Sequence, residues 1–335
     1  MNFRQKSLMA GVGLLVAAGL FVIWQPSQSI RGSMAGEAFC SGYPTGYWGS
    51  QLHAGPGDRS QAISQLESSG ADSVGVLREL LREHADPEVR LTAAELLGKL
   101  GPVAQAAGDD LIQATLDADP HIRNLAVVTI PKVETPVGKA LTALIPLLKS
   151  EHAPDAARAI SVYRGQAKAA LPDLVKLLED ESRDTLTRWN AARALGKLGP
   201  EGIEALPVLI RFTTSPEETL REHSAEAIGD IGPTAVEGIP ALLDCLDDPA
   251  TKVRRDAVRS LGYIGLGAKS AVPQLKLLLK DPEEMVRQAT TDALKIIAPE
   301  ELPVEAPKAD VPASGQEKKA EEQSEVPAAE EKTKT

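Results

Sequence analysis

Apolar residues recur along this chain at spacings of three and four positions, in short blocks that end at glycine or proline. In one such block, Val253, Ala257 and Leu261 fall on a single face of a helix, as in an amphipathic helix that packs by that face. Gly265 follows the block, and glycine tolerates the left-handed backbone found just past a helix end. The pattern therefore predicts an all-α fold built from short helices.

Over most of their length the blocks repeat with a fixed period of about 33 residues, a length typical of helical repeats. An arginine occupies the same position in several of the repeats: Arg90, Arg123, Arg188, Arg221, Arg254 and Arg287. Such a period indicates an α-solenoid, in which each helical hairpin packs only on its neighbours. We expect the solenoid to occupy residues 58–299.

Asp-Pro pairs are expected to begin the first helix of several repeats. Asp accepts hydrogen bonds from the free N–H groups of a first turn, and proline is tolerated at the first helical position. The pairs are Asp86-Pro87, Asp119-Pro120, Asp248-Pro249 and Asp281-Pro282. A second series, Pro207, Pro240 and Pro273, keeps the same period as the arginines. These prolines are expected in the first turn of the second helix, where the missing N–H does no harm.

The repeat arginines could bind an acidic partner or hold the stack together. We favour the structural role, in which each arginine hydrogen-bonds an Asp or a helix end of a neighbouring repeat. In several repeats an Asp precedes the arginine by four residues, which places both on one helix face. Five positions after the arginine, the charges alternate in sign along Arg193, Glu226, Arg259 and Asp292. This second column predicts a ladder of ion pairs between repeats.

The repeat phrase resembles that of a known family. It is written most fully as Val89-Arg90, Ala93-Ala94 and Leu97-Gly98-Lys99-Leu100-Gly101, followed in later repeats by Ala-x-Pro-x-Leu-x-x-Leu-Leu. This phrase resembles the HEAT-repeat family, in particular its short phycobilisome-lyase-type variety. The resemblance implies a superhelix of helical hairpins. Members of the wider family range from chromophore lyases to scaffolds and a di-iron hydroxylase, so the resemblance specifies the fold more closely than the function.

The period fails in one stretch, residues 131–165. Ala153 stands where the repeat arginine is expected, and Pro131 takes the place that Gly98 holds in the preceding repeat. Such a break can bend the superhelix or create a site, and we favour the bend.

The amino-terminal segment indicates a location. Arg4 and Lys6 precede an uncharged, mostly apolar run from Leu8 to Trp24, a length near the lower limit for crossing a bilayer. Residues 1–30 are therefore expected to be a signal anchor or a signal peptide, and we favour the anchor. The expected location is the cell membrane, as a single-pass protein with its repeats on the extracytoplasmic side. Cleavage would instead leave an exported or periplasmic protein.

A Gly-rich and aromatic-rich linker is expected over residues 31–57, because glycine and proline break helices. Its aromatic residues are Phe39, Tyr43, Tyr47 and Trp48. They could cover the open apolar face of the first repeat, which we favour, serve as a recognition segment for a partner, or belong to a disordered spacer. Trp189 and Tyr263 are further candidates for partner binding.

Composition and net charge limit the classes of molecule that this chain is expected to bind. Aromatic residues make up only 3% of the chain and the net charge is −11. Residues 300–335 carry ten acidic and five basic side chains, so −5 of that charge belongs to them. This Pro/Ala/Glu/Lys segment is expected to be a disordered tail. An acidic chain without a basic stripe is a poor candidate for binding nucleic acid, so we expect no nucleic acid partner.

No catalytic motif is evident, and we expect no cofactor and no metal. The sequence has no His-Glu pair in the order used by the di-iron hydroxylases of this repeat class, because its pairs run in reverse, as in Glu222-His223. The favoured hypothesis is a membrane-tethered or exported scaffold that is not an enzyme and that binds a protein partner through its repeat surface. An alternative is a lyase-like accessory factor that handles a cofactor. A metal-dependent hydroxylase is disfavoured.

Overall fold

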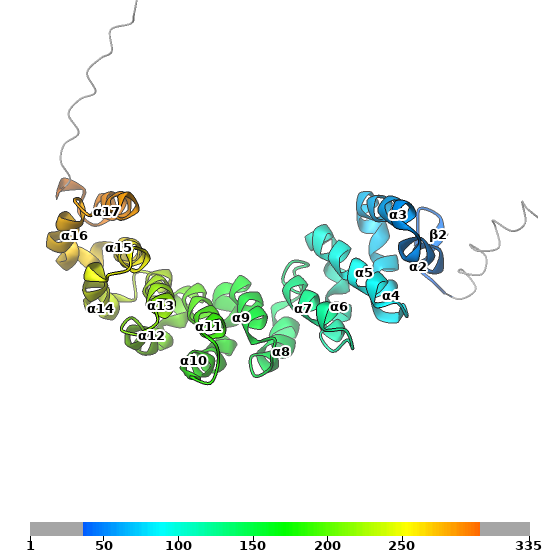
Figure 1. Ribbon diagram of the computed structural model, residues 1–335, viewed down its shortest axis with the longest axis horizontal. Helices are drawn as coiled ribbons and strands as arrows, with labels where there is room; N and C mark the ends of the chain where they lie inside the picture. Colours follow the sequence, from blue (N-terminus) through cyan, green and yellow to red (C-terminus); the bar gives the residue numbers. More distant parts are fainter. Residues whose placement is uncertain (1–35, 302–335) are drawn as a thin grey trace, which may run out of the picture.

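Two rows of helices run along the molecule over residues 36–301, the part of the chain that the computed structural model describes. One row consists of α5 (Pro87–Leu100), α7 (Pro120–Thr129), α9 (Ala153–Val162), α11 (Thr185–Lys197), α13 (Glu218–Ile231), α15 (Thr251–Ile264) and α17 (Glu284–Ile297). The other consists of α6 (Gly108–Ala114), α8 (Val137–Leu147), α10 (Leu171–Glu179), α12 (Leu206–Phe212), α14 (Ile239–Asp244) and α16 (Val272–Leu278). Figure 1 shows the first row on the inner, concave side of an arc and the second on its outer side.

Short 3₁₀ segments connect the two rows: η2 (Gly101–Ala107), η3 (Arg164–Ala170), η4 (Gly199–Ala205), η5 (Val236–Gly238), η6 (Cys245–Asp247) and η7 (Gly265–Ala271), with η8 (Pro299–Glu301) after α17. Several begin at a glycine with positive φ, such as Gly265 at 74°. The expected helix stop at this residue is confirmed. Pro207, Pro240 and Pro273 lie in the first turns of α12, α14 and α16, as predicted.

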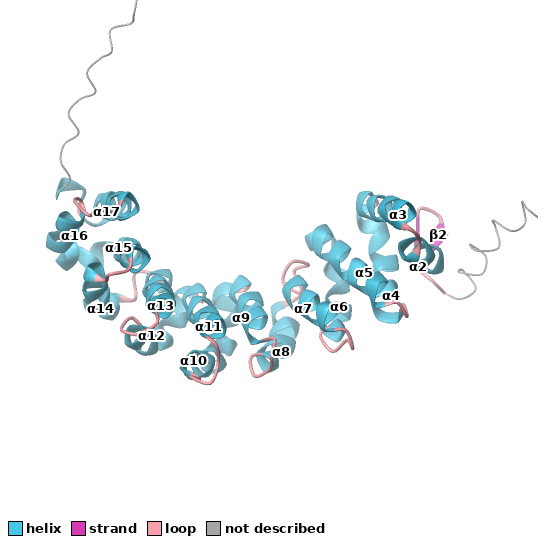
Figure 2. Ribbon diagram, viewed as in Figure 1, coloured by secondary structure: helices cyan, strands magenta, loops and turns pink. Residues whose placement is uncertain are grey.

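The amino-terminal end of the described chain is also mostly helical. It contains a short antiparallel hairpin of β1 (Phe39–Cys40) and β2 (Tyr43–Pro44), then α2 (Thr45–His53), α3 (Pro56–Ser68), η1 (Gly70–Ser73) and α4 (Val74–Glu83). Helices α3 and α2 pack on α5 and α4 respectively, so they extend the array (Figure 2). A loop was expected here, but the burial of Trp48 and Leu52 stabilises α2 in its place.

A column of glycines lets neighbouring inner helices approach closely. A Cβ added to Gly196 would lie 2.6 Å from the Cα of Ala227, and one added to Gly229 would lie 2.6 Å from the Cα of Ser260. Both distances are too short for any side chain. The tight stacking of α11, α13 and α15 therefore requires glycine at these positions.

The stretch 131–165 lacks this column. Pro131 and Tyr163 stand where the repeat calls for glycine. The two inner helices concerned, α7 and α9, have 10 residues each, against 13 or 14 for α5, α11, α13, α15 and α17. The irregularity seen in the sequence thus corresponds to a pair of shortened inner helices.

The assignment to a membrane is corrected. None of the helices in residues 36–301 is long and apolar enough to cross a bilayer. The apolar run from Leu8 to Trp24, on which that assignment rested, lies outside the described residues, as does the expected tail from residue 302 onward. A single-pass membrane protein is therefore not supported.

Candidate functional site

The repeat arginines join adjacent repeats. Arg221 donates from Nε and Nη2 to the carboxylate of Asp248, at 2.7 and 3.0 Å, and from Nη1 to the carbonyl oxygens of Ser215 and Pro216. Arg90 with Asp117 and Arg254 with Asp281 repeat this arrangement, always with the Asp 27 residues after the arginine. We call these three bidentate pairs the clamps.

The remaining repeat arginines make weaker versions of the clamp. Arg123 reaches His152 and Glu151, at 3.4 and 3.3 Å. Arg188 donates to the carbonyl oxygen of Leu178 and lies 3.4 Å from Glu217. The hydrogen bonds found for Arg287 go to the carbonyl oxygens of Asp281 and Pro282.

The four Asp-Pro pairs are not equivalent. Asp86 and Asp119 cap α5 and α7 by accepting from backbone N–H groups at 2.9 and 2.8 Å, as predicted. Asp248 and Asp281 instead lie six residues before Arg254 and Arg287, not four. They accept the hydrogen bonds of the preceding repeat arginines, Arg221 and Arg254, in the clamps. The Asp four residues before an arginine is therefore not its partner. A search of the sequence for an Asp 27 residues after an arginine would have found the partners of Arg90, Arg221 and Arg254.

Electrostatics strengthen the clamps. The hydrogen bonds from Arg90 lower the pKa of Asp117, against the opposing effect of burial. Burial is the largest single effect on Asp248 and acts to raise its pKa, but the hydrogen bonds from Arg221 and from the backbone N–H of Ala250, together with the nearby arginine charges, lower the pKa overall. Both carboxylates are therefore ionised at neutral pH and bound to a fixed cation.

The proposed ladder of alternating charges forms in only one place among the described residues. Arg193 Nε lies 3.9 Å from Glu226 Oε2, across α11 and α13. Arg259 contacts Asp256 and Tyr263 of its own helix, and Asp292 contacts Lys295 and Gln288 of its own helix. Long side chains reach partners one turn away more readily than the next helix. A pair the sequence did not suggest, Arg255 with Glu222 at 3.5 Å, joins α13 and α15.

The amino-terminal aromatic residues divide into buried and exposed. Trp48 is 1% exposed and donates to the carbonyl oxygen of Cys40 at 3.2 Å. Tyr43 stacks on Tyr47 with ring centroids 4.2 Å apart, and Tyr43 and Phe39 remain exposed. Glu79 of α4, which the sequence did not single out, accepts from the backbone N–H of Ala38 at 2.9 Å.

Trp189 and Tyr263 both lie on the concave side, on α11 and α15. Trp189 stacks on His223 of α13, with centroids 4.5 Å apart, and the Arg193 guanidinium lies 5.7 Å from its ring centroid. Trp189 is therefore partly covered by its neighbours. Tyr263 is 48% exposed, and its hydroxyl accepts a hydrogen bond from Arg259 at 3.1 Å.

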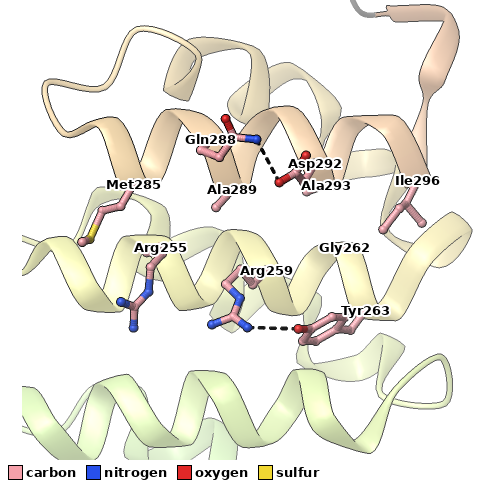
Figure 3. Close-up of a pocket in the computed structure, with 10 residues that line it drawn as sticks. All are labelled: Arg255, Arg259, Gly262, Tyr263, Met285, Gln288, Ala289, Asp292, Ala293 and Ile296. Carbon is pink, nitrogen blue, oxygen red and sulfur yellow. Dashed lines mark hydrogen bonds between the residues drawn. The ribbon is translucent and has the colours of Figure 1, made fainter.

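A hollow lies between the inner helices α15 and α17 and has a volume of about 430 Å³ (Figure 3). Its apolar lining includes Tyr263, Met285 and Ile296, which are each about half exposed. Large apolar side chains exposed together on one face are characteristic of binding surfaces. We call this the α15–α17 groove.

Charged groups form the polar edge of the α15–α17 groove. Arg255 is held by Asp256 at 2.7 and 2.8 Å, and Arg259 leans over Tyr263 with its guanidinium 5.9 Å from the ring centroid. Asp292 accepts from Gln288 on the α17 side, as Figure 3 shows. The groove thus combines an apolar floor with fixed charges of both signs, which favours oriented contact with a mixed surface.

The thiols and histidines form no evident reactive centre in the described part of the chain. Burial in the core raises the pKa of Cys245 to about 11, so its thiol is protonated at neutral pH. Within residues 36–301, no group of three or more His, Cys, Asp and Glu residues is placed to hold a metal ion.

Solved structures share this architecture. A chain in the crystal structure of Kap121p bound to Nup53p aligns with 75% of this chain and 33% of its own length, at 15% identity and a TM-score of 0.54. A chain in the structure in which Kap95p binding induces the switch loops of RanGDP to adopt the GTP-bound conformation aligns with 75% of this chain and 40% of its own, at 13% identity and a TM-score of 0.52. The aligned part of either protein is therefore less than half of its length.

The structure of human deoxyhypusine hydroxylase in complex with glycerol also matches 75% of this chain and 95% of its own, at 19% identity, but with a TM-score of only 0.31. No curated protein matches the sequence. A family model for HEAT repeats matches five overlapping segments, residues 51–130, 74–164, 141–229, 171–262 and 239–307. This model describes HEAT repeats in general and gives no support to the phycobilisome-lyase-type variety in particular. With most of its length covered by these repeats, the chain belongs to the HEAT-repeat family.

Proposed function

We propose that this chain is a scaffold, not an enzyme, and that it binds a protein partner along its concave surface. The observation that carries the proposal is the α15–α17 groove, where Tyr263, Met285 and Ile296 are exposed side by side with Arg255 and Arg259. Aromatic residues, Met and Arg are the types enriched in protein interfaces. Solenoids of this kind present long concave surfaces suited to extended contacts.

The similar solved structures support the same class of function. Kap121p is bound to Nup53p in one of them, and Kap95p binds RanGDP in the other. Their similarity to this chain is one of fold, so the identity of any partner has to come from this surface itself.

Site-directed photo-crosslinking tests the proposal. A photoreactive phenylalanine analogue at Tyr263 should trap a defined protein in extracts of the native cells, because this side chain faces the groove. The matched control places the same analogue at Leu266, which is also exposed but lies in η7, beyond the end of α15. A single product formed only from position 263 supports the proposal. No product, or the same products from both positions, contradicts it.

A further inference from the structure

Two adjoining hollows lie on the concave side at the irregular stretch of the solenoid. The first, between α7 and α9, has a volume of about 260 Å³ and is lined by Val128, Pro131, Lys132, Arg158, Ala159 and Val162. The second, between α9 and α11, has a volume of about 200 Å³ and is lined by Arg158, Ser161, Asn190, Arg193 and Lys197. Because Arg158 lines both, they form one site, which we call the paired hollow.

The lining of the paired hollow is basic. It includes Lys132, Arg158, Arg193 and Lys197, and neither hollow is lined by an acidic residue. The carboxylates nearest to these cations lie outside the lining: Asp155 is 3.6 Å from Arg158, Glu226 is 3.9 Å from Arg193, and Asp230 is 2.6 Å from Lys197. The paired hollow is therefore a positively charged site on the concave surface of an acidic protein, the surface that we propose to be functional.

Two of these arginines differ from the arginines of the clamps. The guanidinium groups of Arg90, Arg221 and Arg254 each donate several hydrogen bonds to carboxylate and carbonyl oxygens. Over residues 36–301, the ion pairs of Arg158 and Arg193 are longer than 3.5 Å. The Arg193 guanidinium also lies over the Trp189 ring, but its Nε is buried without a hydrogen-bond partner in that part of the chain. Buried donors of this kind are nearly always satisfied in proteins. These two arginines therefore have donors to spare for a bound carboxylate.

The rest of the lining distinguishes between classes of anion. Val162 is 59% exposed over the α7–α9 hollow, beside Val128 and Ala159, which suits an apolar side chain. In the α9–α11 hollow, Asn190 is 2% exposed and its Oδ1 has no hydrogen-bond donor within the described residues. A peptide can supply an apolar side chain, carboxylates and N–H donors together, whereas a phosphate group offers mainly acceptors.

We propose that the paired hollow binds an acidic peptide segment of a protein partner. An apolar side chain of that segment packs on Val162, and flanking carboxylates bind Arg158 and Arg193. This inference rests on the proposed scaffold function and names the partner chemistry at a second place on the concave surface. It gives the irregular stretch a role as a site, the alternative that ranked below a bend from the sequence alone.

Fluorescence anisotropy with synthetic peptides tests the inference on the full-length chain. The probe is a labelled peptide in which two glutamates flank a leucine, and the comparison peptides replace the glutamates by glutamine or the leucine by alanine. The probe should bind, and each comparison peptide should bind more weakly. The double variant Arg158→Gln with Arg193→Gln should lose about tenfold or more in affinity. Arg158 and Arg193 are partly exposed and lie outside the clamps, so the variant should retain its helix content by circular dichroism.

The matched control is the double variant Arg259→Gln with Lys295→Gln, which removes the same number of positive charges from partly exposed side chains of α15 and α17. Equal losses in the two double variants would show a diffuse electrostatic attraction and overturn the assignment. Displacement of the probe by inorganic phosphate as effectively as by unlabelled peptide would assign the site to phosphate instead. A gain in probe affinity on deletion of residues 302–335 would identify the chain's own acidic segment as the occupant. Crosslinking from Tyr263 without any probe binding would leave the scaffold function standing and reject this inference alone.

Discussion

At the residue scale, the clamps explain most of what the repeat arginines do. Each clamp joins a guanidinium to a carboxylate of the next repeat and to the carbonyl oxygens that precede its own helix. Arg221 and Asp248 are largely buried, with side-chain exposures of 16% and 8%. Removing one partner of a buried ion pair leaves an unpaired charge in the protein interior, which strongly destabilises the folded state. The sequence favours a structural role for these arginines, with an Asp or a helix end of a neighbouring repeat as the partner. The aspartate cited in support of that role, four residues before the arginine, is not that partner, because helical spacing relates positions within one helix only.

The substitution Asp248→Asn tests the energetic weight of a clamp. It keeps an oxygen acceptor for the N–H of Ala250 but leaves the Arg221 guanidinium without a carboxylate. We expect the free energy of unfolding to fall by about 2 to 4 kcal/mol, measured by urea denaturation. The control is Asp247→Asn at the neighbouring position, which should change stability by less than about 0.5 kcal/mol. Equal effects at the two positions would contradict a special role for the clamp.

The clamps also predict a dependence on pH. The pKa of Asp117 is lowered in the folded protein by hydrogen bonds from Arg90, whereas in the unfolded chain it returns to its ordinary value of about 3.9. The clamp therefore stabilises the fold fully above about pH 4 and loses this contribution as the pH falls through the lower folded pKa. The stability difference between the wild type and Asp117→Asn should be large at neutral pH and shrink as the pH falls below the ordinary pKa of an aspartate. A difference independent of pH would show that ionisation of Asp117 does not contribute.

At the element scale, the spacing between inner helices depends on residues without side chains. Gly196, Gly229 and Gly262 recur with the period of the repeat, and the first two meet backbone atoms of the next helix within contact distance. The period of these glycines is visible in the sequence, but from the sequence glycine was expected only to end helices or to form turns. The close approach of helices could not be seen because it depends on the neighbouring backbone. The prediction of a loop before α3 was wrong for a related reason. The glycines of this segment indicated a loop, but the burial of Trp48 against neighbouring helices stabilises α2.

The substitution Gly229→Ala tests the helix spacing. A Cβ at this position would lie 2.6 Å from the Cα and Cβ of Ser260, so α13 and α15 would have to separate. We expect a loss of about 1 to 3 kcal/mol in the free energy of unfolding, despite the higher helix propensity of alanine. The control Gly138→Ala lies within α8 and meets nothing within 4 Å. It should be neutral or stabilise by up to about 1 kcal/mol, and the reverse order would refute the packing role of Gly229.

At the scale of the whole molecule, the joints of the arc are unequal. The α13–α15 and α15–α17 joints have both a glycine and a clamp. The joints from α7 to α9 and from α9 to α11 have no bidentate clamp and no inner-helix glycine contact among those found in residues 36–301. Because the stability of a solenoid is close to a sum of terms between neighbours, the middle of the arc should be its least stable part.

Hydrogen exchange with mass spectrometry at increasing urea concentration should show this inequality. Peptides from α13 to α17 are expected to stay protected at urea concentrations where peptides from α7 to α9 already exchange, because partial opening begins where neighbour contacts are weakest. Simultaneous loss of protection throughout residues 56–297 would mean that the joints are equally strong.

The shortened helices α7 and α9 have a mechanical consequence. If the middle of the solenoid is its least stable part, the two arms on either side can change their relative angle there, as at a pivot. A small change of angle at the pivot then moves the far ends of the arms by a larger distance. The paired hollow lies at that pivot, so a peptide seated between α7, α9 and α11 would lock the angle between the two arms. A ligand bound at the middle of the arc would then set the distance between its far ends.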